Sequence, residues 1–524
     1  SATRVDASQL IEKGRENVLL YSQDFSQGAW SKTNLSLTAN QTDPLGGTNA
    51  FLFTSTSASS NLFVQSLSNQ NKVCSIYAKA GNRSIFAIVN NAYGNGATFN
   101  LSAETAVSSG QGSLAVIEDV GNGWFRCSVY FSLGTQFLVV LSDVNGNGYS
   151  NGDTISFFGS QMELGTIATP YIESGATTGK AGILENTPRF DYSGGATCPS
   201  LLLEPSRTNL VPQSEYLASF SGFGITITTN YGISPEGVKN ATRFQTNAGV
   251  RGVIYDGVPV VNGSTYILSM YVKSLSGNQK VRIGADLGCT NPQGAETFDV
   301  GTEWIRVETT ITSSQSSWNV FIDNVESGIN CTGTYLAADL LIYGFQCEQG
   351  SYATSYIPTY GVSQTRAQDN CFGAGDGSTF NDSEGVLFIE AATLSELDIT
   401  ARYFQLSDGT ITANGITFRY YTTTNYFQAL YYVGGAYQAV IGLTLPDSSQ
   451  FNKIAFKYKA NDFALWVNGV QIGTDTSGNT GSVLSNLSFN NNGFDGFEGK
   501  TKQLLYFPTA LSDLDLAILT GATT

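Results

Sequence analysis

The sequence has 524 residues, too many for a single hydrophobic core, and its length predicts about three domains. The formal net charge is −16, with only 26 Lys and Arg residues, which argues against a cationic surface for nucleic acid or for an anionic membrane. The sequence contains no histidine, which excludes Ser-His-Asp and Cys-His catalytic devices within the chain.

The composition favours β-structure. Gly (57 residues), Tyr (26) and Phe (31) are abundant, and only 13% of the residues are charged. Few charged residues are left for the exposed faces of helices, and the many Ser, Thr and Asn residues are typical of extracellular or virion β-sandwich proteins. No apolar run approaches the ~20 residues of a membrane-spanning helix, so we expect no membrane insertion. The sequence opens SATRV, without a methionine or a visible signal peptide, which suggests processing or an upstream segment.

The seven cysteines are scattered, without a Cys-x-x-Cys pair, so a zinc site is not expected. They are predicted to be small, buried side chains. Cys289 and Cys331 flank one β-region, and a disulfide between them is the alternative.

Residues 1–14 are expected to form a connector, and residues 15–173 a first folded unit. Short alternating runs in this unit, such as SIYAKA at 75–80, are separated by clusters of Gly, Asn and Ser. This pattern predicts an antiparallel β-sandwich with one buried face in each sheet. Trp124 follows a glycine turn and begins an alternating run, which predicts core packing, with a sugar-stacking platform as the alternative.

One loop of the first unit suggests metal chemistry. It lies between FLVVLSD and TISFFGS, and oxygen-bearing side chains recur at alternate positions, with Gly148 in the sixth place. That spacing is similar to a calcium loop of the D-x-N-x-N-G type. The candidate calcium ligands are Asp143, Asn145, Asn147, Tyr149 and Asp153. Thr154 stands where an EF-hand has its bidentate Glu, so an Asn- and Gly-rich hairpin loop is the alternative.

Residues 174–206 are predicted to form a second connector, ordered against its neighbours, and residues 207–358 a second copy of the first unit. The run SFFGSQMELGTIATPYIE at 156–173 corresponds to LIYGFQCEQGSYATSYIPT at 341–359. Gly159 aligns with Gly344 (344 − 159 = 185), and Glu163 aligns with Glu348 at the same offset. Both glutamates are expected to be solvated or to cap turns. Trp304 corresponds to Trp124 and carries the same two interpretations.

After a third connector at 359–371, residues 372–524 differ from the other units. Hairpin turns are predicted at Asn461-Asp462 and Asn468-Gly469, and a short helix with Ser512 as its N-cap near the end. Its strands are dense in tyrosine, and adjacent residues of a strand point to opposite faces, so some rings must point outward. The alternatives are core packing, a protein interface and glycan stacking. The candidate residues are Tyr420, Tyr421, Tyr426, Tyr431, Tyr432, Tyr437 and Trp466.

The third unit resembles the laminin-G-like, concanavalin-A-like jelly rolls. The resemblance rests on FNKIAFKYKANDFALWVNGVQIG at 451–473 and FEGKTKQLLYFPTALSDLDL at 497–516. It implies a domain that binds glycans or proteins, or serves as a spacer, and some relatives are glycosidases. Those enzymes carry a Glu-x-Asp-x-x-Glu string that places two carboxylates across the scissile bond. The nearest string here, at 396–401, lacks the final Glu, so no catalytic residue is expected.

The first two units resemble the carbohydrate-binding-module-like sandwiches of bacteriophage tail fibres and other virion appendages. The resemblance rests on SATRVDASQLIEKGRENVLLYSQDF at 1–25, NTPRFDYSGGATCPSLLLEPSRTNLVPQSEY at 186–216 and QCEQGSYATSYIPTYGVSQTRAQD at 346–369. It implies a structural or adhesive protein on the virion surface, such as a tail fibre, head fibre or decoration protein. The implied partners are other virion proteins and a host cell-surface glycan. Such fibres are usually symmetric homo-oligomers, and a trimer is expected.

The expected fold class is therefore all-β, with three tandem antiparallel β-sandwich (jelly-roll) domains, the first two an internal duplication. The expected function is that of a non-enzymatic virion structural protein involved in attachment to a host surface. One alternative is a secreted bacterial carbohydrate-binding adhesin, which would be expected to carry a signal or sorting tail. The other is a polysaccharide-degrading enzyme, against which the incomplete carboxylate string and the lack of histidine argue.

Overall fold

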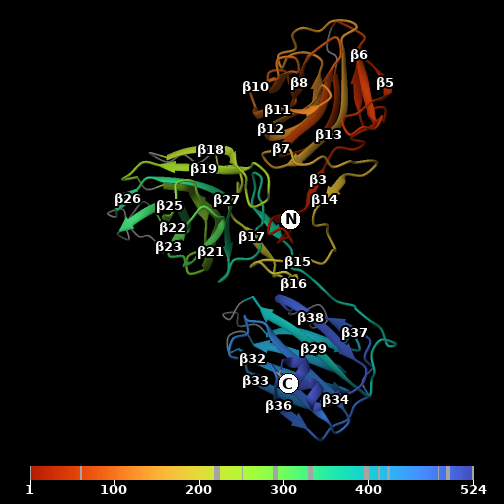
Figure 1. Cartoon of the computed structure of the whole chain (residues 1–524), viewed down its shortest axis with the longest axis vertical. Helices are drawn as coiled ribbons and strands as arrows, with labels where there is room; N and C mark the ends of the chain where they lie inside the picture. Colours follow the sequence, from red (N-terminus) through yellow and green to blue (C-terminus); the bar gives the residue numbers. More distant parts are fainter. Residues whose placement is uncertain are drawn as a thin grey trace.

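The computed structural model contains three β-sandwiches, and the N-terminus lies near the centre of the molecule, among them (Figure 1). This confirms the predicted all-β class. No helix in the described part of the chain is long and apolar enough to span a membrane. The structure describes residues 2–58, 62–217, 225–250, 252–286, 293–327, 334–394, 401–410, 414–421, 425–481, 483–490 and 496–521.

The first sandwich is built on two long paired strands, β7 and β12, whose ladder shifts register between Phe131 and Gln136. Phe86 of β8 packs against Phe157 of β13, with ring centroids 5.2 Å apart, although these strands are not paired. The sheet therefore folds over onto itself around a common core. The strands are β4 (Ser31–Thr33), β5 (Leu35–Gln41), β6 (Ala50–Ser55), β7 (Leu62–Ala80), β8 (Ile85–Val89), β9 (Gly96–Asn100), β10 (Thr105–Ser109), β11 (Gly112–Gly121), β12 (Trp124–Val140) and β13 (Thr154–Leu164).

The second sandwich has two separate sheets, ordered β18-β19-β27-β21-β24 and β20-β25-β22-β23, with β26 on β25. Tyr266 of one sheet packs edge-on against Trp318 of the other, with ring centroids 5.4 Å apart. The strands are β18 (Ile225–Gly232), β19 (Ala241–Thr246), β20 (Gly252–Pro259), β21 (Thr265–Ser274), β22 (Gln279–Asp286), β23 (Gln293–Val300), β24 (Ile305–Thr312), β25 (Ser317–Ser327), β26 (Thr334–Leu336) and β27 (Ala338–Gln349).

The first two sandwiches share one strand order. The path β5-β6-β13-β7-β12 of the first matches β18-β19-β27-β21-β24 of the second. The opposite layer follows β7-β12-β8-β9 in the first and β20-β25-β22-β23 in the second. The difference is that β7 and β12 each run unbroken through both layers, whereas the second sandwich divides each into two strands. The common order is what the predicted duplication requires.

The repeated motif makes the same hydrogen bonds in both copies. Glu163 accepts bonds from the backbone N–H and the hydroxyl of Thr169, at 2.8 and 2.5 Å. Glu348 accepts the same pair from Thr354, at 2.6 and 2.7 Å. Both glutamates cap a turn, which confirms one of the two expectations for them. Their exposed fractions are 2% and 0%, so the other expectation, that they are solvated, is wrong. In each copy the turn folds back on the strand before it, β13 or β27, and covers the carboxylate that caps it.

The segments between the sandwiches are ordered and form small β-structures of their own. Strand β1 pairs with β2, β3 with β14, β15 with β16, and β17 with β28. Strand β16 also pairs with β38 and so extends a sheet of the third sandwich. These strands are β1 (Thr3–Val5), β2 (Ile11–Lys13), β3 (Arg15–Asn17), β14 (Gly179–Ala181), β15 (Phe190–Asp191), β16 (Ser200–Leu203), β17 (Arg207–Asn209) and β28 (Gln364–Arg366).

The hairpin β1–β2 precedes the first sandwich but packs on the second. Ile11 donates its N–H to the carbonyl of Pro235 at 2.8 Å, and its side chain packs with Tyr343 and Tyr356. Lys13 lies between the carboxylates of Glu215 and Glu236, at 2.9 and 3.0 Å. The N-terminal residues therefore hold the second sandwich to the first.

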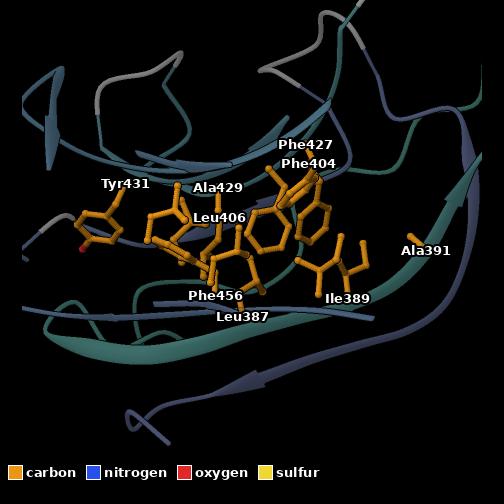
Figure 2. Close-up of a cluster of buried hydrophobic side chains, with 14 of the residues drawn as sticks. Leu387, Ile389, Ala391, Phe404, Leu406, Phe427, Ala429, Tyr431 and Phe456 are labelled. Atoms are coloured by element: carbon orange, nitrogen blue, oxygen red, sulfur yellow. The ribbon is translucent and has the colours of Figure 1, made fainter. Parts of the chain in front are cut away.

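The third sandwich has one sheet ordered β15-β16-β38-β29-β34-β35-β36 and a second ordered β33-β32-β31-β30-β37. Phe456 and Leu387 of the first sheet face Leu406 and Tyr431 of the second across the core (Figure 2). The strands are β29 (Glu384–Thr393), β30 (Ala401–Ser407), β31 (Gly415–Tyr421), β32 (Tyr426–Val433), β33 (Ala436–Thr444), β34 (Asn452–Lys459), β35 (Phe463–Val467), β36 (Val470–Asp475), β37 (Asn486–Ser488) and β38 (Gly499–Phe507).

Local signals in the third unit hold as predicted. Asn468 and Gly469 both have positive φ, at 48° and 85°, and connect β35 to β36 as a tight hairpin turn. The helix α1 (Asp513–Thr520) begins after Ser512, whose side chain accepts the N–H of Asp515. The helix packs on the outer face of the β29–β34–β35 sheet through Leu516.

Candidate functional site

The tyrosine-rich strands divide their rings between the two faces of their sheet, as the sequence predicted. Tyr420 and Tyr431 belong to the core, and the exposed fractions of their side chains are 2% and 0%. Tyr421 and Tyr432, the next residues along, point to the other face. The core-packing interpretation is therefore correct for one ring of each adjacent pair. Of the other two rings, Tyr421 is half-buried and stays a candidate for binding, whereas Tyr432 is buried, although it points away from the core.

The outward residues of β30, β31 and β32 form rows across the sheet. Tyr403 pairs with Arg419, and Arg419 with Gln428. Two positions along, Tyr421 pairs with Tyr426. We call this outer face of the sheet the platform. Its aromatic members are Tyr403, Tyr421, Tyr426, Tyr432 and Tyr437, and Arg419 and Gln428 are the polar residues beside them.

Arg419 connects the middle of the platform to one end. Its guanidinium lies over the ring of Tyr421, 5.0 Å from the centroid, and its Nη2 donates to Oε1 of Gln428. Gln428 in turn donates to the hydroxyl of Tyr426 at 3.4 Å. The rings of Tyr421 and Tyr426 are 6.1 Å apart. The contacts fix these four side chains relative to one another before any ligand is present.

The other end of the platform is a second tyrosine pair. The rings of Tyr432 and Tyr437 are 4.8 Å apart and tilted by 36°. Burial, followed by the hydrogen bond with Tyr437, raises the pKa of Tyr432. Tyr437 is 58% exposed, whereas Tyr432 is 5% exposed. The buried ring of Tyr432 therefore packs beneath the ring of Tyr437, which faces solvent.

A glycine on the edge strand makes room for Tyr426. Gly442 of β33 lies opposite Gln428. A Cβ at this position would lie 2.7 Å from the Tyr426 hydroxyl and 2.8 Å from the carbonyl oxygen of Phe427. The absence of a side chain at 442 thus lets the Tyr426 phenol extend across β33.

Trp466 does not join the platform. It lies on the opposite sheet, in a buried cluster with Val386, Phe388 and Leu516 beneath α1, and only 8% of it is exposed. The prediction that Trp466 contacts a glycan or a partner is therefore wrong, because the terminal helix covers this side chain. The sequence does not reveal that contact. Trp124 is buried as expected, whereas Trp304 is half-buried and donates its Nε1–H to the carbonyl of Ile233 at 3.2 Å.

The candidate calcium loop is held by its own hydrogen bonds. Asp143 accepts from the N–H groups of Asn145 and Asn147, at 2.9 and 2.8 Å, and from the Asn147 side chain. Asp153 accepts from Arg83 at 3.0 Å, and Tyr149 bonds to the hydroxyl of Tyr93 at 2.6 Å. No group of three or more acidic or sulfur ligands gathers in the described residues. Calcium binding stays a prediction. The loop connects β12 to β13, which each pair with β7 and not with each other, so the alternative of a hairpin loop is wrong. The hydrogen bonds within the Asn- and Gly-rich loop account for its conformation.

Two other sequence features lie outside the described residues. The carboxylates of the 396–401 string, Glu396 and Asp398, belong to the segment 395–400. Cys289 and Cys331 also lie outside. Among the described cysteines, Cys74, Cys127 and Cys347 are buried and unpaired, and burial raises the pKa of each thiol. These three match the prediction of small buried side chains, whereas Cys198 is exposed and Cys371 is half-buried, so the prediction is wrong for those two.

The sequence analysis missed Arg419, Gln428 and Tyr403. A signal existed for the first two, because Arg419 is two positions before Tyr421 and Gln428 two positions after Tyr426, and such residues share a strand face. Tyr403 carried no such signal, because its place beside Arg419 depends on the pairing of β30 with β31.

No family model and no curated protein matches this sequence. Among solved structures, the chain is similar to the Ruminococcus gnavus IT-sialidase CBM40, with 16% identity, a TM-score of 0.25, and coverage of 29% of this chain and 97% of that one. It is also similar to the CBM22-1–CBM22-2 tandem of Paenibacillus barcinonensis Xyn10C, with 13% identity, a TM-score of 0.22, and coverage of 64% of this chain and 98% of that one. A third similar structure is that of domains LG4-5 of the mouse laminin alpha1 chain, with 8% identity, a TM-score of 0.20, and coverage of 64% of this chain and 95% of that one. Likenesses at this level assign neither a family nor a ligand to the chain.

Proposed function

We propose that the chain is a non-enzymatic glycan-binding protein whose third sandwich holds an oligosaccharide on the platform. The observation that carries the proposal is the composition of this face. Tyrosine pairs stand at both ends, and Arg419 and Gln428 offer hydrogen bonds between them. Aromatic rings stack on the apolar faces of sugars, while a few placed polar groups bind their hydroxyls.

The dimensions of the platform suit a chain of sugars. Tyr421 pairs with Tyr426 at one end, and Gly415, six positions earlier on the same strand (421 − 415 = 6), pairs with Tyr432 at the other. Six residues of antiparallel strand span about 20 Å. A ligand that touches both tyrosine pairs is therefore an extended oligosaccharide and not a monosaccharide.

The proposal places this binding in a non-enzymatic protein of a virion surface. The non-enzymatic part rests on the incomplete carboxylate string at 396–401 and on the lack of histidine. The virion setting, with a tail-fibre, head-fibre or decoration role and a trimeric assembly, rests on the sequence resemblance of the first two units. Labelling of purified phage particles with an antibody to the chain, followed by electron microscopy, tests the setting, and a secreted adhesin would leave the particles unlabelled.

A glycan array probed with the full chain and two variants tests the binding. Tyr421→Ala removes a platform ring that stacks on Arg419. Tyr231→Ala is a matched control, because Tyr231 is exposed on the second sandwich and stacks on Arg243 at 4.7 Å. We expect the wild-type chain and Tyr231→Ala to bind the same glycans and Tyr421→Ala to lose them. Equal binding by all three would place the glycan site elsewhere, and no binding by any would refute the function.

A further inference from the structure

Within the described residues, Arg419 gives the platform a positive charge without a negative partner. Most other arginines in the described residues face carboxylates, as Arg282 faces Asp323 at 2.9 Å and Arg402 faces Glu498 at 2.8 Å. The other described arginines that stack on a tyrosine without a carboxylate partner, Arg126, Arg207 and Arg306, lie outside the platform. Arg402 is on the strand next to Arg419, but it belongs to the opposite face of the sheet. No carboxylate pairs with Arg419 among the described residues, where its partners are Gln428 and the Tyr421 ring. Its Nε is buried without a hydrogen-bond partner.

The surroundings of Arg419 strengthen this charge. Its guanidinium is half-buried on a face with five tyrosines, where water screens a charge less than at an open surface. The face has no acidic residue at its described outward positions, although the chain as a whole carries −16. The positions are Ala401, Tyr403, Gln405, Ser407, Gly415, Thr417, Arg419, Tyr421, Tyr426, Gln428, Leu430, Tyr432, Tyr437, Val440, Gly442, Thr444, Asn486 and Ser488.

We infer that the platform selects an acidic oligosaccharide, one that carries a carboxylate or a sulfate, and that Arg419 is the residue that selects it. A guanidinium presents planar N–H groups that match the oxygens of either anion. Gln428 and the Tyr421 ring hold the guanidinium in place, so little side-chain entropy is lost on binding. The inference rests on the proposed glycan binding and names the class of glycan.

The test compares glycans that differ in their charge alone. Matched acidic and neutral oligosaccharides on one array, such as tetragalacturonate and its methyl ester, or cellotetraose with and without a sulfate group, are probed with the wild-type chain, Arg419→Gln and Arg419→Lys. The best-bound pair is then measured by calorimetry at low and high salt. Arg243→Gln is the control, because Arg243 also stacks on a tyrosine but is paired with Asp339 at 2.7 Å. Thermal unfolding of each variant checks that it is folded.

We expect the wild type to bind acidic members about tenfold or more tightly than their neutral partners, the ratio of one charge-assisted hydrogen bond. Added salt should lower this ratio of acidic to neutral affinity. Arg419→Gln should abolish the preference, and Arg419→Lys should retain part of it. Arg243→Gln should leave it unchanged. Equal binding of acidic and neutral glycans by the wild type would overturn this inference and leave the proposed function standing. Binding of no glycan, or of acidic peptides alone, would overturn both.

Discussion

Lys13 and Glu236 form a buried ion pair, with Nζ 3.0 Å from Oε2, although 223 positions separate them (236 − 13 = 223). The side chain of Lys13 is 7% exposed and that of Glu236 is fully buried. Burial alone would lower the pKa of Lys13, but the charges of Glu215 and Glu236 raise it well above its usual value. The pair fastens the N-terminal hairpin to the second sandwich.

The substitution Lys13→Met should therefore destabilise the second sandwich strongly. It leaves Glu215 buried without a cation and Glu236 with Arg15 alone, and an uncompensated buried carboxylate costs about 3–5 kcal/mol of unfolding free energy. Lys280→Met is the control, because Lys280 and its partner Asp299 are 60% and 80% exposed, and a surface pair contributes about 1 kcal/mol or less. Chemical denaturation measures both. A Lys13→Met protein as stable as Lys280→Met would show that the hairpin is not fastened by this pair.

The same pair predicts a dependence of stability on pH. Burial alone would raise the pKa of Glu236, but Lys13 and Arg15 lower it from its usual 4.5 to about 2. A carboxyl with a lowered pKa stabilises the fold above its unfolded pKa, and the contribution is lost as the pH falls from about 4.5 toward 2. Glu236→Gln should flatten the decline in melting temperature over this range. Glu303→Gln, at an exposed position of the same sandwich, should leave the decline as it is in the wild type.

The duplicated turn predicts equal effects at two distant sites. Glu163→Ala and Glu348→Ala each remove the acceptor of a buried threonine N–H and hydroxyl. An unsatisfied buried group costs about 1–3 kcal/mol, so each variant should lose a similar amount of unfolding free energy. The double variant should lose their sum, because distant sites with no shared partner act independently. A neutral effect at one site alone would mean that the two copies use the motif differently.

The loop at 143–153 gives a prediction about calcium. Because Asp143 already accepts three hydrogen bonds from within the loop, we expect the same melting temperature in calcium and in a chelator. Asp143→Ala should lower the stability of the first sandwich by about 1 kcal/mol, because it leaves the loop N–H groups without their acceptor. A calcium-dependent rise in the melting temperature that Asp143→Ala abolishes would establish the metal site instead.

The sequence predicts what is local and repeated, and it misses what depends on distant contacts. The turn at Asn468-Gly469 and the cap at Ser512 are readable because each conformation is set by residues within one turn. The burial of Trp466 under α1 and the pairing of Lys13 with Glu236 join segments that no local pattern connects.

For the platform, strand alternation gave the direction of each tyrosine. It did not give the neighbour across the sheet, because register depends on the whole hairpin. The place of Arg419 beside Tyr403 and Gln428 therefore appears only in the folded chain.

A crystal structure of the full chain with a bound acidic oligosaccharide tests the central claim most directly. The account predicts sugar rings against Tyr421 and Tyr437, with the anionic group on the guanidinium of Arg419. An oligosaccharide seated on either of the first two sandwiches, with the β30–β32 face bare, would contradict it.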